Sequence, residues 1–250
     1  MDEKQASFLS LLSTSASSIS DKLLGDSIVR FAECISTQLG VPQFLIEILL
    51  LIEDKRFPQH PGFDYLAILR AIFANPRSDV LQGASTISQQ IFTMREVTRS
   101  GRRPKRDMSF KVKQLIWAAH HERRHHKAKI LSEYLDSVYV GRSHDGVVSG
   151  ASGYFGVPIE CLDPAQAFFL IERIGSPNVV RPARVVNLLN RVQIQEFLIR
   201  SKIDSTHVVE VYSSIFGDVP TVRKLQSHFK NARCRRVPYG RAHSIRLERL

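Results

Sequence analysis

The chain has 250 residues, 43% of them hydrophobic, which is enough to bury one sizeable core in one domain or at most two. Lys and Arg exceed Asp and Glu by 35 to 24, and the net charge of +11 favours an anionic partner such as nucleic acid, membrane phospholipid or a pyrophosphate substrate. The three cysteines, Cys34, Cys161 and Cys234, are odd in number and widely spaced, which excludes a disulfide framework and a cysteine metal site.

The first forty residues are expected to form a lead-in and a helix. Residues 1 to about 20 are rich in Ser and predict a loose segment. Apolar residues at helical spacing from Leu24 to Ile35 predict a helix over residues 21–39, closed by Gly40.

Neither a signal peptide nor a membrane anchor is expected. The N-terminus lacks a basic start followed by an apolar run. The most apolar stretch, residues 44–52, contains Glu47 and is too short to span a bilayer.

The next predicted helix carries the first candidate chemistry. Pro42 suits a helix first turn, an apolar stripe follows, and the helix reaches Glu53 and Asp54 before Pro58 stops it. A helix over residues 65–74 and a turn over 75–78 come next.

Thr86 is expected to cap a helix that runs to about Glu96, with the Gln89 side chain reaching back in a capping box. The basic segment Arg99–Arg106 has no apolar periodicity and predicts a loop between two helical blocks.

The rest of the chain is also expected to be mainly helical. Helices are predicted over residues 109–122 and 127–139, the second ended by Gly141, and residues 150–156 are interpreted as a tight glycine-rich turn. Asp163–Gln166 predicts a capping box before a helix that stops near Gly175, and residues 184–200 predict one amphipathic helix. Residues beyond about 216 show no clear periodicity.

We expect three parts: an N-terminal lead-in and helix (1–40), a main domain (41–205) and a basic extension (206–250).

The strongest candidate site is the segment from Glu53 to Asp64. A carboxylate at a helix C-terminus, next to Leu51 and Ile52, is poorly hydrated and faces the negative end of the helix dipole, so its pKa is expected to rise. That suits a general base. The alternative is that Glu53 and Asp54 only solvate the helix end and that His60 packs in a loop.

A second candidate segment, Gly83 to Gln90, feeds hydroxyl and amide side chains into a helix N-terminus. Backbone N–H groups there can bind an anion, and uncharged donors can orient a phosphate or a sugar hydroxyl. The alternative is a plain capped helix.

Together these segments resemble the first two motifs of glycosyltransferase family 51, the bacterial peptidoglycan glycosyltransferases, written E-D-x-x-F-x-x-H-x-G and G-x-S-T-x-x-Q-Q. Residues 127–136 resemble the family's K-x-x-I-L-E-x-Y-L-N, and residues 150–156 its G-A-x-x-Y-F-G. The resemblance implies Glu53 as catalytic base. It implies a substrate-binding set consisting of Asp54, Phe57, His60, Gly62, Asp64, Gly83, Ser85, Thr86, Gln89, Gln90, Lys111 and Gln114.

The same resemblance implies a fold and a reaction. The fold would be mainly helical and lysozyme-like, with a globular lobe and a smaller membrane-facing lobe. The reaction would transfer a glycan chain from undecaprenyl pyrophosphate onto lipid II, forming a β-1,4 bond with inversion, at the periplasmic face of the bacterial cytoplasmic membrane. A divalent cation such as Mg²⁺ and other cell-wall synthesis proteins would be its cofactor and partners.

The family's third motif, R-K-x-x-E, is altered here. It aligns with residues 110–114, so Phe110 replaces the arginine and Gln114 the glutamate, and only Lys111 is retained. Thr93 and Met94 replace the usual Lys-Asn after the second motif. Lys105, Arg106 and Lys113 are candidates to supply the missing positive charge. The competing hypothesis is therefore a catalytically impaired homologue that binds lipid II or glycan as an accessory protein.

Two further patterns favour other functions less well. Residues 121–125 spell H-E-x-x-H, the helical zinc-protease motif, but the two intervening arginines favour a solvated helix end. Basic segments 99–106 and 230–236 lack interleaved aromatic residues, so we expect no nucleic-acid partner. The single tryptophan, Trp117, is explained by core packing.

Overall fold

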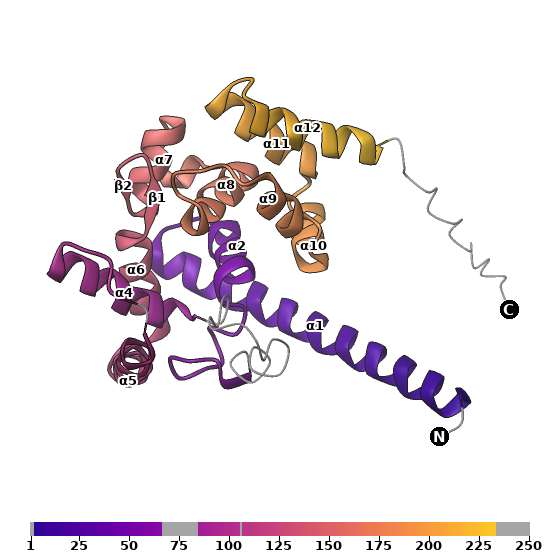
Figure 1. Ribbon diagram of the computed structural model, residues 1–250, viewed down its shortest axis with the longest axis horizontal. Coiled ribbons are helices and arrows are strands. Elements are labelled where there is room, and N and C mark those ends of the chain that lie inside the picture. Colours follow the sequence, from indigo (N-terminus) through magenta and orange to yellow (C-terminus); the bar gives the residue numbers. More distant parts are fainter. Residues whose placement is uncertain (1–2, 67–84, 106, 234–250) are drawn as a thin grey trace, which may run out of the picture.

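The first helix is longer than the sequence predicts. The computed structural model describes residues 3–66, 85–105 and 107–233. Helix α1 spans Glu3–Leu39, and its N-terminal end projects beyond the other helices (Figure 1). The prediction of a loose segment over residues 1 to 20 is wrong because this stretch contains neither Gly nor Pro, so nothing breaks the helix that follows it.

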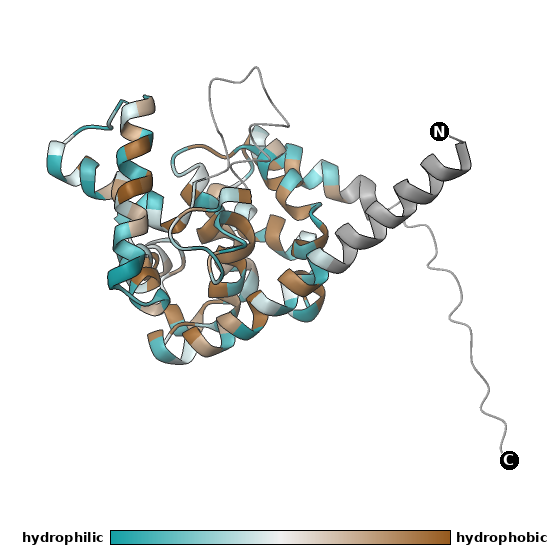
Figure 2. Cartoon of the chain, turned by 90° about the horizontal axis from the view of Figure 1, so that it is seen from below, coloured by the Kyte–Doolittle hydropathy of each residue, from teal (hydrophilic) through white to brown (hydrophobic). Residues whose placement is uncertain are grey.

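Two helices form the centre of the core. Helix α2 spans Gln43–Glu53 and α8 spans Pro164–Gly175. Every residue of α2 from Leu45 to Leu51 is buried, and α8 is buried without a break from Ala167 to Arg173. A helix that is apolar on all sides must lie inside the protein, which places α2 between α1 and α8. Hydrophobic residues concentrate where helices face one another (Figure 2).

Three helices form the part of the fold that faces the end of α2. Helix α4 spans Ile87–Ser100, α5 spans Met108–Arg124 and α6 spans Lys127–Ser137. Helix α4 packs against both α5 and α6. The left-handed Gly101 ends α4, and Asp107 caps α5 by accepting a hydrogen bond from the Phe110 N–H. The loop predicted over residues 99–106 is confirmed for residues 101–105, whereas Arg99 and Ser100 belong to α4.

A small hairpin and a short helix follow α6. Strands β1 (Tyr139–Gly141) and β2 (His144–Asp145) pair antiparallel, and α7 spans Val147–Phe155 before the 3₁₀ helix η1 at Ile159–Cys161. The predicted tight turn at 150–156 is wrong, because most of this segment is the C-terminal part of α7. A Cβ atom at Gly150 would lie 2.7 Å from Val140 Cγ2, so this glycine permits close packing instead of a turn.

Four helices follow α8 in the described residues up to 233. The predicted helix over 184–200 is two helices, α9 (Pro182–Leu189) and α10 (Val192–Arg200), and each buries its own apolar face. The Asp163–Gln166 capping box before α8 is confirmed.

Helices α11 (Ser205–Phe216) and α12 (Pro220–Arg233) lie in a region for which no helix was predicted. Helix α12 buries Val222, Leu225 and Phe229, which share one helical face.

Some predictions fall outside the described residues, namely most of the helix at 65–74 and the turn at 75–78; Tyr65 and Leu66 are helical. Among the described residues, no helix combines the length and the apolar character needed to cross a bilayer.

Candidate active site

The two candidate segments meet at the C-terminal end of α2. Asp54 Oδ2 accepts a hydrogen bond from the Ile87 N–H at 2.9 Å, and Gln90 Nε2 donates to Glu53 Oε2 at 3.0 Å. The first bond places a carboxylate on a backbone donor that has no partner within its own helix, in the first turn of α4, where the helix dipole favours negative charge. Residues separated by more than thirty positions therefore form one site.

His60 fixes the loop that follows Asp54. Its Nε2 lies 2.9 and 3.0 Å from the two Asp54 carboxylate oxygens, and its Nδ1 accepts the Gly62 N–H at 3.1 Å. Because Nδ1 is an acceptor, the proton of the neutral ring is on Nε2 and is donated to Asp54. Thr86 Oγ1 donates to the Gly62 carbonyl at 2.7 Å, which ties this loop to the start of α4.

Other residues of the predicted set build the same loop. Phe57 is fully buried, and Lys127 Nζ lies 4.2 Å above its ring. Gly62 has φ +106°, and a Cβ atom there would lie 2.6 Å from the Ala118 carbonyl, so no other residue fits. Asp64 is buried and pairs with Arg56 at 3.6 Å. The substrate-binding role of these residues stays a prediction. Gly83 lies outside the described residues.

The Glu53 carboxylate is mostly buried, with 13% of the side chain exposed. Burial raises its pKa above 4.5, while the Gln90 hydrogen bond and the positive charges of Arg184 and Arg191 lower it and Asp54 raises it again. Burial has the largest effect, and the expected rise in pKa is confirmed. A carboxylate whose pKa is raised in this way is a stronger base than an ordinary glutamate.

Gln90 is oriented by a buried tyrosine. Tyr134 Oη donates to Gln90 Oε1 at 2.8 Å, so the Gln90 amide nitrogen must face Glu53. Tyr134 is fully buried, and burial raises its pKa well above 10.0. The sequence analysis did not single out this tyrosine, although it belongs to the matched motif at residues 127–136.

Lys111 is held by three oxygen atoms. Its Nζ donates to Ser85 Oγ at 3.2 Å, to Gln89 Oε1 at 2.9 Å and to Gln114 Oε1 at 2.8 Å. Gln114 in turn donates to the Gln89 carbonyl at 2.8 Å and to Thr93 Oγ1 at 2.9 Å. Both the oxygen and the nitrogen of the Gln114 amide are therefore hydrogen-bonded.

The predicted capping box at Thr86 is only half correct. Thr86 Oγ1 accepts the Gln89 N–H at 3.3 Å, but the Gln89 side chain turns to Lys111 instead of back to residue 86. Its Nε2 atom is buried without a hydrogen-bond partner. Of the other candidate cations, Lys105 and Lys113 are exposed, and Arg106 lies outside the described residues. Met94 packs against the core.

The described residues around Glu53 do not fit a divalent cation. The Asp54 carboxylate is occupied by His60 and Ile87, and the amide oxygens of Gln89 and Gln114 accept from Lys111. Mg²⁺ prefers one or two available carboxylates and an octahedral set of oxygens. We therefore derive no step through a metal.

The H-E-x-x-H sequence serves packing and charge pairing. His121 stacks on Trp117 with ring centres 4.5 Å apart and contacts His125 at 4.4 Å. Glu122 accepts from Ser88 Oγ at 2.6 Å and pairs with Lys127 at 2.6 Å. In the parts of the chain that the structure describes, no group of three metal-binding side chains is found.

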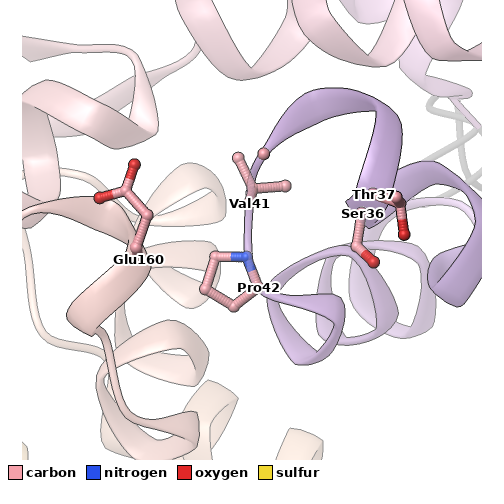
Figure 3. A pocket seen from close by; sticks show the side chains of 6 residues that line it. Ser36, Thr37, Val41, Pro42 and Glu160 are labelled. Atoms are coloured by element: carbon pink, nitrogen blue, oxygen red, sulfur yellow. The ribbon is translucent and has the colours of Figure 1, made fainter.

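Two of the surface hollows lined by described residues lie near the two ends of α2. One, of about 580 Å³, lies beside the loop after α2 and is lined by Arg56, His60 and Asp64 together with Leu23, Leu24 and Tyr65, among others. The other, of about 360 Å³, lies at the opposite end of α2, where Glu160 faces Val41 and Pro42 (Figure 3). The first adjoins the candidate site, and the second does not.

Arg184 on α9 is a further site residue that the sequence analysis missed. Its Nη2 lies 3.7 Å from Glu53 Oε1, and its Nε lies 3.3 Å from Oε1 of the fully buried Glu172. No local pattern indicates this contact, because the residues come from three separate helices.

A family model described as transglycosylase matches residues 29–199. Penicillin-binding protein 1A of Vibrio cholerae is 30% identical over 186 residues, which cover 71% of this chain and 22% of that relative. Penicillin-binding protein 1B of Haemophilus influenzae is 30% identical over 164 residues (64% and 20%), and penicillin-binding protein 1A of Rickettsia felis is 33% identical over 149 residues (58% and 18%). The chain spans about a fifth of the length of these relatives.

Proposed function

Since the chain belongs to the transglycosylase family, we propose that it polymerises lipid II into β-1,4-linked glycan strands, with Glu53 as the general base. The observation that carries this proposal is the buried Glu53 carboxylate, held by Gln90 from the second motif at 3.0 Å. The two segments of the predicted site are thereby joined around one acid.

The reaction begins at the acceptor sugar. The Glu53 carboxylate removes the proton of the lipid II 4-hydroxyl while that oxygen attacks the anomeric carbon of the donor glycan. The bond between this carbon and the pyrophosphate oxygen breaks, and the leaving oxygen takes the electron pair, so the configuration at the carbon is inverted. Positioned proton transfer of this kind contributes roughly a hundred- to ten-thousandfold in rate.

Lys111 is the described cation best placed to receive the pyrophosphate. It lies against Ser85 Oγ just before the first turn of α4, where backbone N–H groups and the helix dipole also favour an anion. Its charge would offset the negative charge that develops on the leaving group. Ser85 and Gln89 would hydrogen-bond the same group.

We place the substrate-bearing face of the protein at a membrane surface. Met108, Val112 and Ile116 lie one turn apart on α5, and they are 75%, 47% and 66% exposed. Exposed basic residues, including Arg102 and Lys105, lie in the segment just before α5. Such a surface suits the boundary of an anionic bilayer, here the periplasmic face of the bacterial cytoplasmic membrane, and helices α4 and α5 would form the membrane-facing lobe.

A lipid II polymerisation assay tests the proposal. We expect Glu53→Gln to lose at least about a hundredfold in rate, while the exposed Glu196→Gln retains wild-type activity. Circular dichroism would verify that both variants are folded. Wild-type turnover by Glu53→Gln would show that Glu53 is not the base.

The second candidate function is that of an accessory protein that binds lipid II or glycan alongside other cell-wall synthesis proteins without polymerising it. The amide of Gln114 in place of the family's glutamate favours this alternative, because it contributes no negative charge beside Lys111. Saturable binding of the wild-type protein to vesicles containing lipid II, without polymer formation, would support it over the enzyme.

A further inference from the structure

We propose that Arg184 is a positioning residue for Glu53 and that Gly175 leaves the space in which the Arg184 guanidinium lies. This inference rests on the proposed function, in which Glu53 is the base. It assigns a role to three residues from α8 and α9 that lie outside the matched motifs.

The Arg184 guanidinium lies between two carboxylates. Its Nη2 is 3.7 Å from Glu53 Oε1, and its Nε is 3.3 Å from Glu172 Oε1. The Arg184 side chain is 33% exposed, whereas those of Glu53 and Glu172 are 13% and 0% exposed. Charges in such partly buried surroundings interact more strongly than surface pairs.

Glu172 is a rigid anchor for this arrangement. Its Oε2 accepts from Arg173 Nε at 3.0 Å and from Tyr212 Oη at 2.7 Å, so the carboxylate cannot turn. Its other oxygen, Oε1, faces Arg184 and has no aligned hydrogen bond, and the same holds for Arg184 Nε. A fixed negative charge thus holds the guanidinium on one side, which leaves its Nη2 directed to Glu53.

The position of the Arg184 guanidinium explains why residue 175 is a glycine. A Cβ atom at residue 175 would lie 2.0 Å from Arg184 Nη2 and 2.4 Å from its Cζ. Gly175 has no left-handed φ and is exposed, so neither its backbone nor core packing requires a glycine. Any side chain at this position must displace Arg184 from the two carboxylates.

Arg184 is one of several charged groups that face Glu53. Burial and Asp54 raise the pKa of Glu53, whereas Arg184 and Arg191 lower it. The Tyr134 hydroxyl is linked to Glu53 through the Gln90 amide. Moving the Arg184 charge away should therefore raise the pKa of Glu53 and release its carboxylate from one orientation.

The test follows the ¹³C signal of the Glu53 carboxyl group in an NMR pH titration, whose midpoint gives the pKa. The signal that is missing from the spectrum of Glu53→Gln is assigned to this group. We expect a higher midpoint in Arg184→Gln and in Gly175→Ala than in wild type, and partial recovery in Arg184→Lys. Two controls should match wild type: Arg181→Gln, an exposed arginine at the start of α9, and Gly25→Ala, where a Cβ atom meets nothing within 4 Å.

Polymerisation rates give a second reading. We expect kcat of Arg184→Gln and Gly175→Ala to fall on the order of tenfold or more, with the acid limb of the pH profile moved to higher pH. Unchanged Glu53 midpoints in both variants would overturn the positioning role, whatever the rates. The titration needs no turnover, so a wild-type protein that does not polymerise lipid II would instead refute the proposed function. If Arg184→Gln fails to fold, Gly175→Ala decides the question.

Discussion

Gln114→Glu restores the family's glutamate, and the structure predicts that the change destabilises this protein. Gln114 is 5% exposed, and its amide nitrogen donates to the Gln89 carbonyl at 2.8 Å and to Thr93 Oγ1 at 2.9 Å. A carboxylate oxygen in place of that nitrogen would face the Gln89 carbonyl oxygen with no proton between them. The Thr93 hydroxyl could turn to donate to it, but only by leaving the Gln89 carbonyl that it now contacts.

The size of this destabilisation follows from the contacts of Gln114. Replacing the amide donor to the buried Gln89 carbonyl by an oxygen that finds no donor there costs about 1–3 kcal/mol, and the negative charge on that oxygen adds to the cost. The bond from Lys111 to the new carboxylate would gain charge assistance of about 1 kcal/mol. We therefore expect a net loss of about 2 kcal/mol in the free energy of unfolding, which corresponds to a melting temperature lower by about 4–8 °C.

Thermal unfolding of wild type, Gln114→Glu and Lys111→Met, together with the double variant, would measure this effect. The double variant should be less stable than Gln114→Glu alone, because it loses the one new attraction. A melting temperature of Gln114→Glu equal to or above that of wild type would refute the reasoning. A large gain in lipid II polymerisation by this variant would favour a degenerated active site over one rebuilt around an amide.

Three further outcomes are expected. Glu53→Gln should raise the melting temperature near pH 7, because burial raises the pKa of Glu53 above 4.5 and the stability contributed by its protonated form is lost as pH rises through that higher pKa. The difference between variant and wild type should disappear below about pH 4.5, and equal melting curves of the two proteins at both pH values would contradict the prediction. Gly62→Ala should cost at least about 3 kcal/mol in urea unfolding, because it combines φ +106° with a backbone clash, whereas Gly101→Ala, with φ +68° and open space, should cost about 1 kcal/mol; similar costs would show that the contact with α5 is unimportant. Lys127→Met should cost about 3 kcal/mol, because it leaves the buried Glu122 carboxylate without its cation, and adding Glu122→Gln should recover part of this loss in the same assay.

Local rules explain why much of the fold could be predicted. The apolar run before Glu53, the Asp163 capping box and the loop after α4 depend on residues within about one helical turn, so the sequence specifies them directly. The same rules failed where local signals were ambiguous. The apolar face of α12 lies in a polar helix, and the serine-rich start of α1 has no residue that breaks a helix.

By itself, the sequence determined the family and the place of Glu53 at the end of a buried helix, because ordered motifs and helical periodicity are properties of nearby residues. Only the tertiary structure decided which groups surround that acid. Arg184 reaches it from a helix distant in sequence and is held there by Glu172, and Gln114 satisfies both Lys111 and the Gln89 carbonyl. Charge pairs and buried hydrogen bonds of this kind depend on how helices pack, and no spacing along the chain encodes them.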